Sequence, residues 1–332
     1  MARNSATAIA RPDMTPEEIA EILRPKSEWK RFLIAFKKGW QLHLMMLLPV
    51  IYWILFEAAP LYGLQIVFRD YTARKGIMGS DWVGLYFFKE FFRKPDAGQI
   101  IWNTMAISLY SICCGFPIPI MLALIIHINE HKGLRKIAQN VSYVPHFISV
   151  VVMVGILNQV FNPVSGIVGA FNRMLGISTY VDIRTNKLAF RHLYVWSGIW
   201  QGMGWSSIIY LSALSSVSQD LHEAAKIDGA SRFRRVLAVD LPAIAPTIAI
   251  MLILRFGSIL SVGYEKVYLM QNSLNISRSE VISTYVYKYG LGKNNLSFGS
   301  AVGIMNSVVN TSMIILVNKV ANWLSDGEAG LF

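Results

Sequence analysis

The sequence predicts an all-α membrane protein that crosses the bilayer several times. Of its 332 residues, 54% are hydrophobic and only 15% are Asp, Glu, Lys or Arg, whereas soluble domains are about a quarter charged. The uncharged residues are also clustered, because residues 97–129 and 137–172 form runs of 33 and 36 residues without one of these four types. About 20 apolar residues span a bilayer, so each run is long enough to cross it.

Six apolar segments have the length of a transmembrane helix. They cover residues 42–61, 101–126, 141–161, 193–214, 243–262 and 301–321. The first contains Pro49 and carries Glu57 near its far end. The fourth is rich in Gly and Ser, which favours close helix packing in lipid. We therefore expect a transmembrane domain over residues 41–322 and a tail over residues 323–332.

Residues 1–40 are expected to form two short helices ahead of the first span. Thr15 and Glu18 have the spacing of a helix-capping box, and Pro25 should end that helix. The helix that follows has an apolar face, formed by Trp29, Phe32, Leu33, Phe36 and Trp40. Its basic residues lie mostly elsewhere, which is typical of a helix in the membrane interface. The alternative is a soluble amphipathic helix packed on a partner.

Charge predicts the orientation in the membrane. Eight Lys and Arg residues precede the first span, which places the N-terminus in the cytoplasm because the first helix usually dominates topology. Six spans then return the C-terminus to the cytoplasm and leave loops 62–100, 162–192 and 263–300 outside. These loops are long for simple connectors, so they either dock a protein outside the membrane or pack against another membrane subunit. Because the basic residues are scattered over every loop, we expect no nucleic-acid partner.

No catalytic or metal-binding constellation is recognisable. His127 and His131 are four residues apart but lack the intervening Glu of the helix-protease pattern, so a surface or capping role is expected. Cys113 and Cys114 are adjacent in an apolar run, which favours neither a disulfide nor a zinc site. The chain also lacks a Gly-rich phosphate-binding loop. We expect no catalytic residue, metal or cofactor in this chain.

The segment between the fourth and fifth spans, residues 218–242, has the features of a docking element. It predicts a short helix with small residues on one side, an interruption at Gly229, a basic second turn and a stop at Pro242. Small residues permit close approach to a groove in another protein. Charged residues are available to fix the register: Glu223, Asp228, Arg232 and Arg235. A membrane protein with such an element is expected to be driven or gated by a soluble partner.

The spacing of this segment resembles the signature loop of permease subunits in bacterial binding-protein-dependent ABC importers. Glu223-Ala224-Ala225 is followed after three residues by Gly229, and after nine more by Val239, one residue and Leu241-Pro242. The family usually has Ile where Val239 stands. In that family the loop is a coupling helix that enters a cleft of the ATPase. The resemblance therefore assigns ATPase coupling to Glu223, Ala224, Ala225, Asp228, Gly229, Arg232, Leu241 and Pro242.

Other segments resemble the branch of the family that imports oligosaccharides and polysaccharide fragments, which includes the alginate importer. They are residues 103–124, with Gly115-Phe116-Pro117-Ile118-Pro119 inside, and residues 143–149, 262–267 and 281–287. The resemblance implies a type I ABC importer permease fold of six transmembrane helices in the inner membrane. It also implies a second homologous permease subunit, an ATPase dimer that binds ATP and Mg, a periplasmic solute-binding protein and an oligosaccharide substrate.

Two other protein classes are weaker interpretations. A secondary solute carrier of the inner membrane, not coupled to ATP, needs no docking loop and often shows internal repeats, which we do not find. A six-span membrane enzyme should present clustered His, Asp or Glu at a membrane face, and the sequence shows no such cluster. The chain itself is therefore expected to be non-catalytic, with ATP hydrolysed by a partner subunit.

Polar residues within the spans are candidates for the substrate pathway. Arg255 lies 13 residues beyond Pro242, about 20 Å along a helix, and is expected to attract an anionic or polyhydroxylated sugar. Alternatively, Arg255 pairs with Glu57 or Glu265 or extends to lipid headgroups. Asn158, Gln201 and Asn306 either contact sugar or tie helices together. Trp200 either stacks on sugar or anchors the helix at the membrane interface. Glu265 is the last candidate for the pathway.

Overall fold

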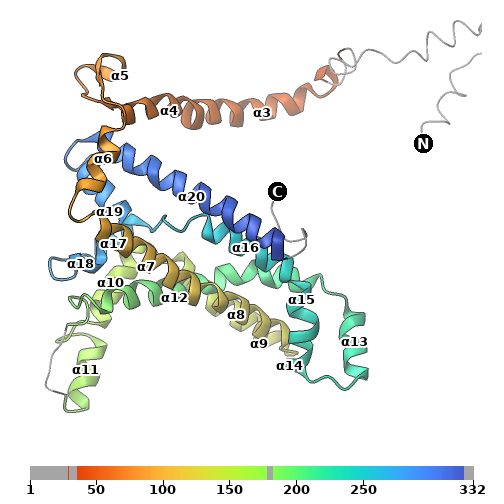
Figure 1. Ribbon diagram of the computed structural model, residues 1–332. Helices are drawn as coiled ribbons and strands as arrows, with labels where there is room; N and C mark the ends of the chain where they lie inside the picture. The colour runs from red at the N-terminus through yellow and green to blue at the C-terminus, as the bar shows by residue number, and fades with distance from the viewer. Residues whose placement is uncertain (1–28, 30–35, 178–181, 325–332) are drawn as a thin grey trace, which may run out of the picture. The chain divides into compact units, whose positions relative to one another are not determined.

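The computed structural model describes residue 29, residues 36–177 and residues 182–324. It is mostly helical and divides into two units, residues 1–64 and residues 65–332. The all-α class is therefore confirmed (Figure 1). The helix predicted to begin at Thr15, residues 27–28 and 30–35 of the amphipathic helix that follows it and most of the C-terminal tail lie outside the described residues.

The first unit contains the first predicted span. Helix α3 (Trp40–Trp53) continues through the π-helical turn η1 (Ile54–Ala58) into α4 (Ala59–Leu61). With the 3₁₀ turn η2 (Tyr62–Phe68), it makes an apolar helical stretch of 29 residues. No residue of α3 is buried, as is expected of a helix whose surroundings are lipid or another chain.

The second unit begins with a two-stranded sheet and short helices and continues with longer helices. Its first elements are β1 (Arg69–Asp70), α5 (Gly76–Gly79), β2 (Asp81–Trp82), which pairs antiparallel with β1, and α6 (Tyr86–Arg93). Next come α7 (Ala97–Gly115), α8 (Pro117–Ile128), α9 (Lys132–Tyr143), η3 (Val144–Phe147), α10 (Val150–Val160), α11 (Ile167–Met174) and α12 (Ala189–Ser215).

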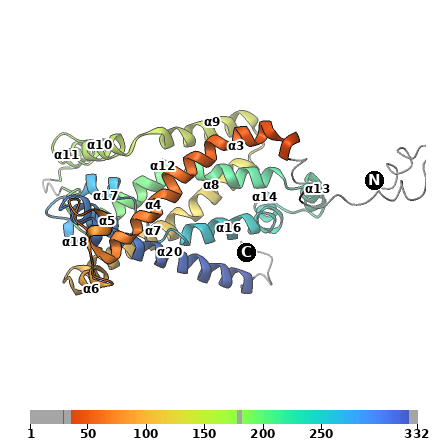
Figure 2. The same ribbon diagram turned by 90° about the horizontal axis from the view of Figure 1, so that it is seen from above.

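The remaining elements continue from the end of α12. They are α13 (Gln219–Ile227), α14 (Arg232–Arg235), η4 (Val236–Asp240), α15 (Leu241–Ala243), α16 (Ala245–Phe256), α17 (Tyr264–Met270), α18 (Ile276–Ser279), α19 (Ile282–Val286), η5 (Tyr287–Leu291) and α20 (Leu296–Leu324). Figures 1 and 2 both place α13 at the opposite end of this unit from α11 and α18.

The helices long and apolar enough to cross a membrane do not reach the predicted number of six. Within the described residues there are three, Trp40–Phe68, Ala97–Ile128 and Leu296–Trp323, or up to five if two bent helix pairs each count as one span. Helix α12 covers the fourth predicted span with 27 residues but is not among them. The Gly, Ser and Trp residues of α12 lower its mean hydropathy.

Two predicted spans are bent. In the third, Lys132–Phe147 and Val150–Val160 meet at 99°, because Ile148 is extended and the Ser149 hydroxyl accepts from the Val152 N–H at 3.3 Å to begin a new helix. In the fifth, Arg232–Ala243 and Ala245–Phe256 meet at 63°. Helix α16 ends before Gly257, so the expected boundary at residue 262 lies beyond the helix.

Proline explains two of the π-helical turns. Both η1 and η4 end two residues before a proline, Pro60 and Pro242 respectively. A proline inside a helix lacks the N–H donor, and its ring presses on the carbonyl four residues earlier, which here lies in the middle of each π turn. The wider turn accommodates that carbonyl while the helix continues.

Helix α12 lies at the centre of the second unit's packing. Buried Tyr210, Leu211 and Leu214 of α12 pack with α8 and with Ile244 at the α15–α16 bend. A second cluster joins α6, α7, α19 and α20 around Phe91, and a third joins Ile107 and Phe190 to the α17 region. Helix α12 passes so close to α9 that a Cβ on Gly204 would overlap the backbone carbonyl of Ser142.

We expect Gly204→Ala to destabilise the protein, because the new methyl group forces α12 away from the Ser142 carbonyl. Overpacking of this kind costs about 1–3 kcal/mol. The control is Gly202→Ala on the same helix, where an added Cβ meets no atom within 4 Å. Thermal unfolding of the purified chain in detergent should show a lower midpoint for Gly204→Ala only; equal midpoints for both variants would contradict the close approach.

Candidate functional site

The predicted docking element is a short helix with well-defined ends. At its start, the Ser218 hydroxyl accepts a hydrogen bond from the Asp220 N–H at 3.2 Å. At its end, the Ala230 N–H donates to the Ala225 carbonyl and the Gly229 N–H to the Lys226 carbonyl, at 2.9 and 3.0 Å. This pair of bonds is a Schellman motif, which requires a left-handed residue. Gly229 has φ of +76° and supplies it.

The helix α13 presents small and apolar groups to its surroundings. Glu223, Ala224 and Gly229 are exposed, while Ala225 is half-buried. Two large apolar side chains are also exposed, Ile227 at 86% and Phe233, in the following α14, at 72%. Exposed apolar groups next to small residues suit a protein-docking surface. The prediction from sequence named the small and charged residues but not Ile227 and Phe233.

Residues 232–243, which follow α13, connect this surface to helix α16. Arg232 forms an exposed ion pair with Glu130 in the α8–α9 connection, with Nη2 and Oε2 3.0 Å apart. Leu241 is half-buried and Pro242 exposed in α15, directly before the bend that leads into α16. Asp228, by contrast, is exposed and occupies the C-cap position of α13.

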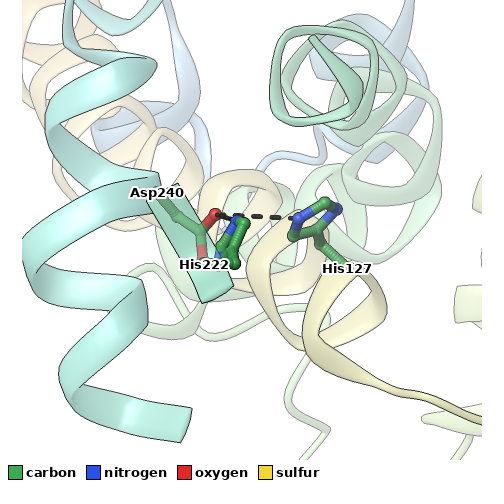
Figure 3. A group of neighbouring side chains, drawn as sticks. All are labelled: His127, His222 and Asp240. Carbon is green, nitrogen blue, oxygen red and sulfur yellow. Dashed lines mark ion pairs between the residues drawn. The ribbon is translucent and has the colours of Figure 1, made fainter. Parts of the chain in front are cut away.

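Two histidines and a carboxylate meet where α13 lies against the rest of the unit. His127 of α8 and His222 of α13 both direct Nε2 toward Oδ1 of Asp240, at 3.6 and 3.2 Å (Figure 3). The sequence predicts no such cluster, and it expects a surface or capping role for His127. The ring of His127 is instead largely buried, because folding brings together residues that are widely separated in the chain.

A second candidate region is a cavity of about 590 Å³ beside α12. Its lining includes Gln201, Trp205, Arg255 and Lys266 together with small and apolar residues, and no Asp or Glu is among the lining residues. Arg255 also borders a smaller cavity between α7 and the end of α16. Among the described residues Arg255 forms no ion pair, so the predicted pairing with an acid such as Glu265 is not seen.

Lys266 is a cavity residue that the sequence prediction missed. It is buried at 9% exposure, although it lies in the predicted outer loop. Its Nζ donates to the Tyr194 carbonyl at 3.0 Å and lies 4.9 Å from the centroid of the Tyr194 ring. Burial lowers the pKa of Lys266 to about 8. The resemblance of residues 262–267 to carbohydrate permeases was the available signal.

Of the other predicted pathway residues, one lines the cavity and four do not. Gln201 lines it and donates to the Ile148 carbonyl at 2.6 Å. Trp200 is exposed and not part of the lining, whereas Trp205 is in the lining and stacks on His146 with centroids 4.5 Å apart. Asn158 and Glu265 are exposed, and Asn306 is half-buried, all outside the lining.

Known proteins are similar to this chain over nearly its whole length. The chain is 36% identical over 311 residues to the Bacillus subtilis polygalacturonan/rhamnogalacturonan transport system permease protein YteP, covering 94% of this chain and 96% of that protein. It is also 36% identical over 301 residues to Protein LplB of the same organism, covering 91% and 94%.

Solved structures agree with these sequence relationships. A chain of a bacterial alginate ABC transporter, crystallised with a periplasmic protein bound to an alginate pentasaccharide, superposes with a TM-score of 0.81 and 34% identity over 91% of this chain and 100% of that one. A bacterial ABC transporter involved in import of the acidic polysaccharide alginate gives a TM-score of 0.81 and 35% identity over 87% and 98%.

The family model that matches is the binding-protein-dependent transport system inner membrane component, over residues 115–326. The match begins at the junction of α7 and α8 and includes both the α13 segment and most of the residues that line the cavity. Together with the type I ABC permease fold of the solved structures, it shows that this chain belongs to the family of binding-protein-dependent ABC importer permeases.

Proposed function

We propose that this chain is a permease subunit of an ATP-driven importer of acidic oligosaccharides, those that contain uronate residues. The observation that carries the substrate class is the cavity beside α12, which holds two cationic side chains and no carboxylate. The carboxylate of a uronate residue in this cavity would contact Arg255 and Lys266. The hydroxyl groups of the same sugar would contact Gln201 and the glycine positions of α12. Lys266 is buried, so little water screens its attraction for an anion, whereas Arg255 is exposed.

The relatives support the same class of substrate. One relative is a permease of a polygalacturonan/rhamnogalacturonan transport system, and one of the similar solved structures is a transporter involved in import of the acidic polysaccharide alginate. A cavity for neutral sugars would not require two cations. The cations therefore favour a uronate oligosaccharide over a neutral one.

The coupling element of this proposal is residues 218–242. Glu223, Ala224, Ala225 and the Gly229 turn would enter a cleft of a partner ATPase that binds ATP and Mg, with Ile227 and Phe233 adding apolar contact. Arg232, Leu241 and Pro242 would hold the segment against the membrane helices. In this arrangement both termini lie in the cytoplasm, and the loops around α11 and α18 face the solute-binding protein and a second permease subunit.

The experiment that tests the function is ATP hydrolysis by the reconstituted transporter in proteoliposomes with its solute-binding protein. Uronate oligosaccharides should stimulate hydrolysis, and neutral oligosaccharides of the same length should not. Stimulation by neutral sugars alone would overturn the substrate class, and hydrolysis insensitive to any sugar would overturn coupled import.

We expect Arg255→Gln to weaken uptake of uronate oligosaccharides. Loss of one charge-assisted hydrogen bond costs about 1.5–3 kcal/mol, which corresponds to a rise in KM of about tenfold or more. The measurement is uptake of labelled oligosaccharide by proteoliposomes. The control is Arg74→Gln, which removes an exposed arginine outside the cavity. If Arg255→Gln leaves KM unchanged, Arg255 does not contact the substrate.

The reduced pKa of Lys266 predicts a pH dependence. Lys266 is mostly protonated below its pKa of about 8 and loses its charge as the pH rises through that value, while uronate carboxylates stay ionised. Affinity for uronate oligosaccharide should therefore fall between roughly pH 7 and roughly pH 9. Lys266→Met should flatten this profile, and the exposed-residue control Lys132→Met should not. An unchanged profile in Lys266→Met would contradict the assignment.

Gly229→Pro should leave the chain in the membrane but abolish retention of the ATPase subunit and coupled hydrolysis. Proline cannot adopt a φ of +76°, and it removes the N–H that donates to Lys226. Gly76→Pro is a matched control, since Gly76 has φ of +67° and its N–H donates to Thr72 in a segment remote from α13. Affinity purification followed by quantification of the ATPase subunit is the measurement. Normal retention by Gly229→Pro would rule out this docking element.

A further inference from the structure

Three potential metal ligands converge between α8, α13 and η4. They are His127, next to the last residue of α8, His222 in the first turns of α13, and Asp240, the last residue of η4. One ligand atom from each residue lies within 4.8 Å of the other two. Figure 3 shows both imidazole rings directed at the same carboxylate oxygen.

The polar atoms of this cluster are buried without hydrogen bonds. Asp240 is only 1% exposed, and its Oδ1 has no hydrogen-bond partner. Nε2 of His222 and Nδ1 of His127 are likewise buried without a partner. Nε2 of His222 approaches Oδ1 at 3.2 Å but without the geometry of a hydrogen bond. Buried polar atoms in native proteins are nearly always satisfied, so Oδ1 of Asp240 and Nε2 of His222 call for a ligand, whereas Nδ1 of His127 is the ring nitrogen that is not directed at the carboxylate.

The chemistry of the cluster indicates which ligand. Two imidazole nitrogens and one carboxylate oxygen are the donor set of open zinc sites, in which a fourth position is left to water. Bonds of about 2.0–2.1 Å in a tetrahedral site place neighbouring ligand atoms roughly 3.3 Å apart. The two Nε2–Oδ1 distances, 3.2 and 3.6 Å, are close to that value.

We propose that His127, His222 and Asp240 form a binding site for a divalent transition-metal ion of the zinc type. The site joins α13 to α8 and to the end of η4, which belong to separate parts of the chain. A bound ion fixes the position of α13 relative to α8. The proposal concerns metal binding by this chain and requires neither an ATPase nor a sugar, so it stands or falls independently of the proposed transport function.

The test is Zn²⁺ binding by the full chain, purified in detergent and stripped of metal with a chelator. Equilibrium dialysis against Zn²⁺ followed by elemental analysis should give one tightly bound ion per chain. His222→Ala should weaken this binding at least about tenfold, since even changes to groups that only orient a ligand cost 10–100-fold. His131→Ala is the matched control, because His131 is an exposed histidine four residues from His127.

A second measurement separates a specific site from adventitious binding. Zn²⁺ should slow hydrogen–deuterium exchange of the α13 backbone amides in the wild-type chain and in Asp220→Asn, but not in Asp240→Asn, which keeps the shape of the side chain. Equal zinc binding by wild type and His222→Ala, or the absence of stoichiometric binding by wild type, would overturn the proposal. The cluster would then be a histidine–aspartate contact without a metal.

Discussion

Within a bilayer, every backbone polar group must find its partner inside the protein, because no water is present to replace it. This constraint explains how the membrane-type helices of this chain are broken. The widened turns before Pro60 and Pro242 keep the helix continuous where proline removes a donor. At Ile148 the helix does break, and there the Ser149 hydroxyl satisfies an N–H of the next helix while the Gln201 side chain donates to the Ile148 carbonyl. Each interruption is thus paired with a side chain or turn that satisfies it.

The interruption at Ile148 is connected to the cavity beside α12 through Gln201. Gln201 is held by the bend at Ile148, and it lines the cavity on one side. Glycines of α12 serve two purposes along this helix. Gly204 admits the backbone of α9, whereas Gly202 leaves open volume in the cavity wall and Gly198 leaves room for Nζ of Lys266, which would lie 3.3 Å from an added Cβ. A helix rich in Gly and Ser is therefore less apolar than its neighbours because its surface is shared between packing and the cavity.

Local features were predictable from the sequence, and contacts between distant segments were not. Ser218, Gly229 and Pro242 mark the ends of the docking element through capping, left-handed backbone and proline chemistry, all of which act within a few residues. Arg255 was predicted to lie in the fifth apolar helix and is found in the last turn of α16, whereas its depth in a membrane stays a prediction. The 99° bend was missed because apolar periodicity continues across Ile148 and Ser149. Lys266 and the His127–His222–Asp240 cluster were missed for another reason: their burial results from tertiary packing, and no local pattern in the sequence specifies it.

The docking element and the cavity are linked by one covalently continuous path. From α13 the chain passes through α14 and η4 to Asp240, turns at Ile244 and continues as α16, which carries Arg255 in its last turn. A flexible turn at Ile244 would absorb any movement of α13. Ile244 is instead 1% exposed and packed among residues of α8 and α12, and packed interiors transmit displacement rather than deform freely. If α13 is moved by a partner, the bend therefore moves with α16 as a unit, and the displacement reaches the cationic wall of the cavity about 16 Å further along the helix. This geometry gives a physical route by which an event at α13 changes the surroundings of Arg255.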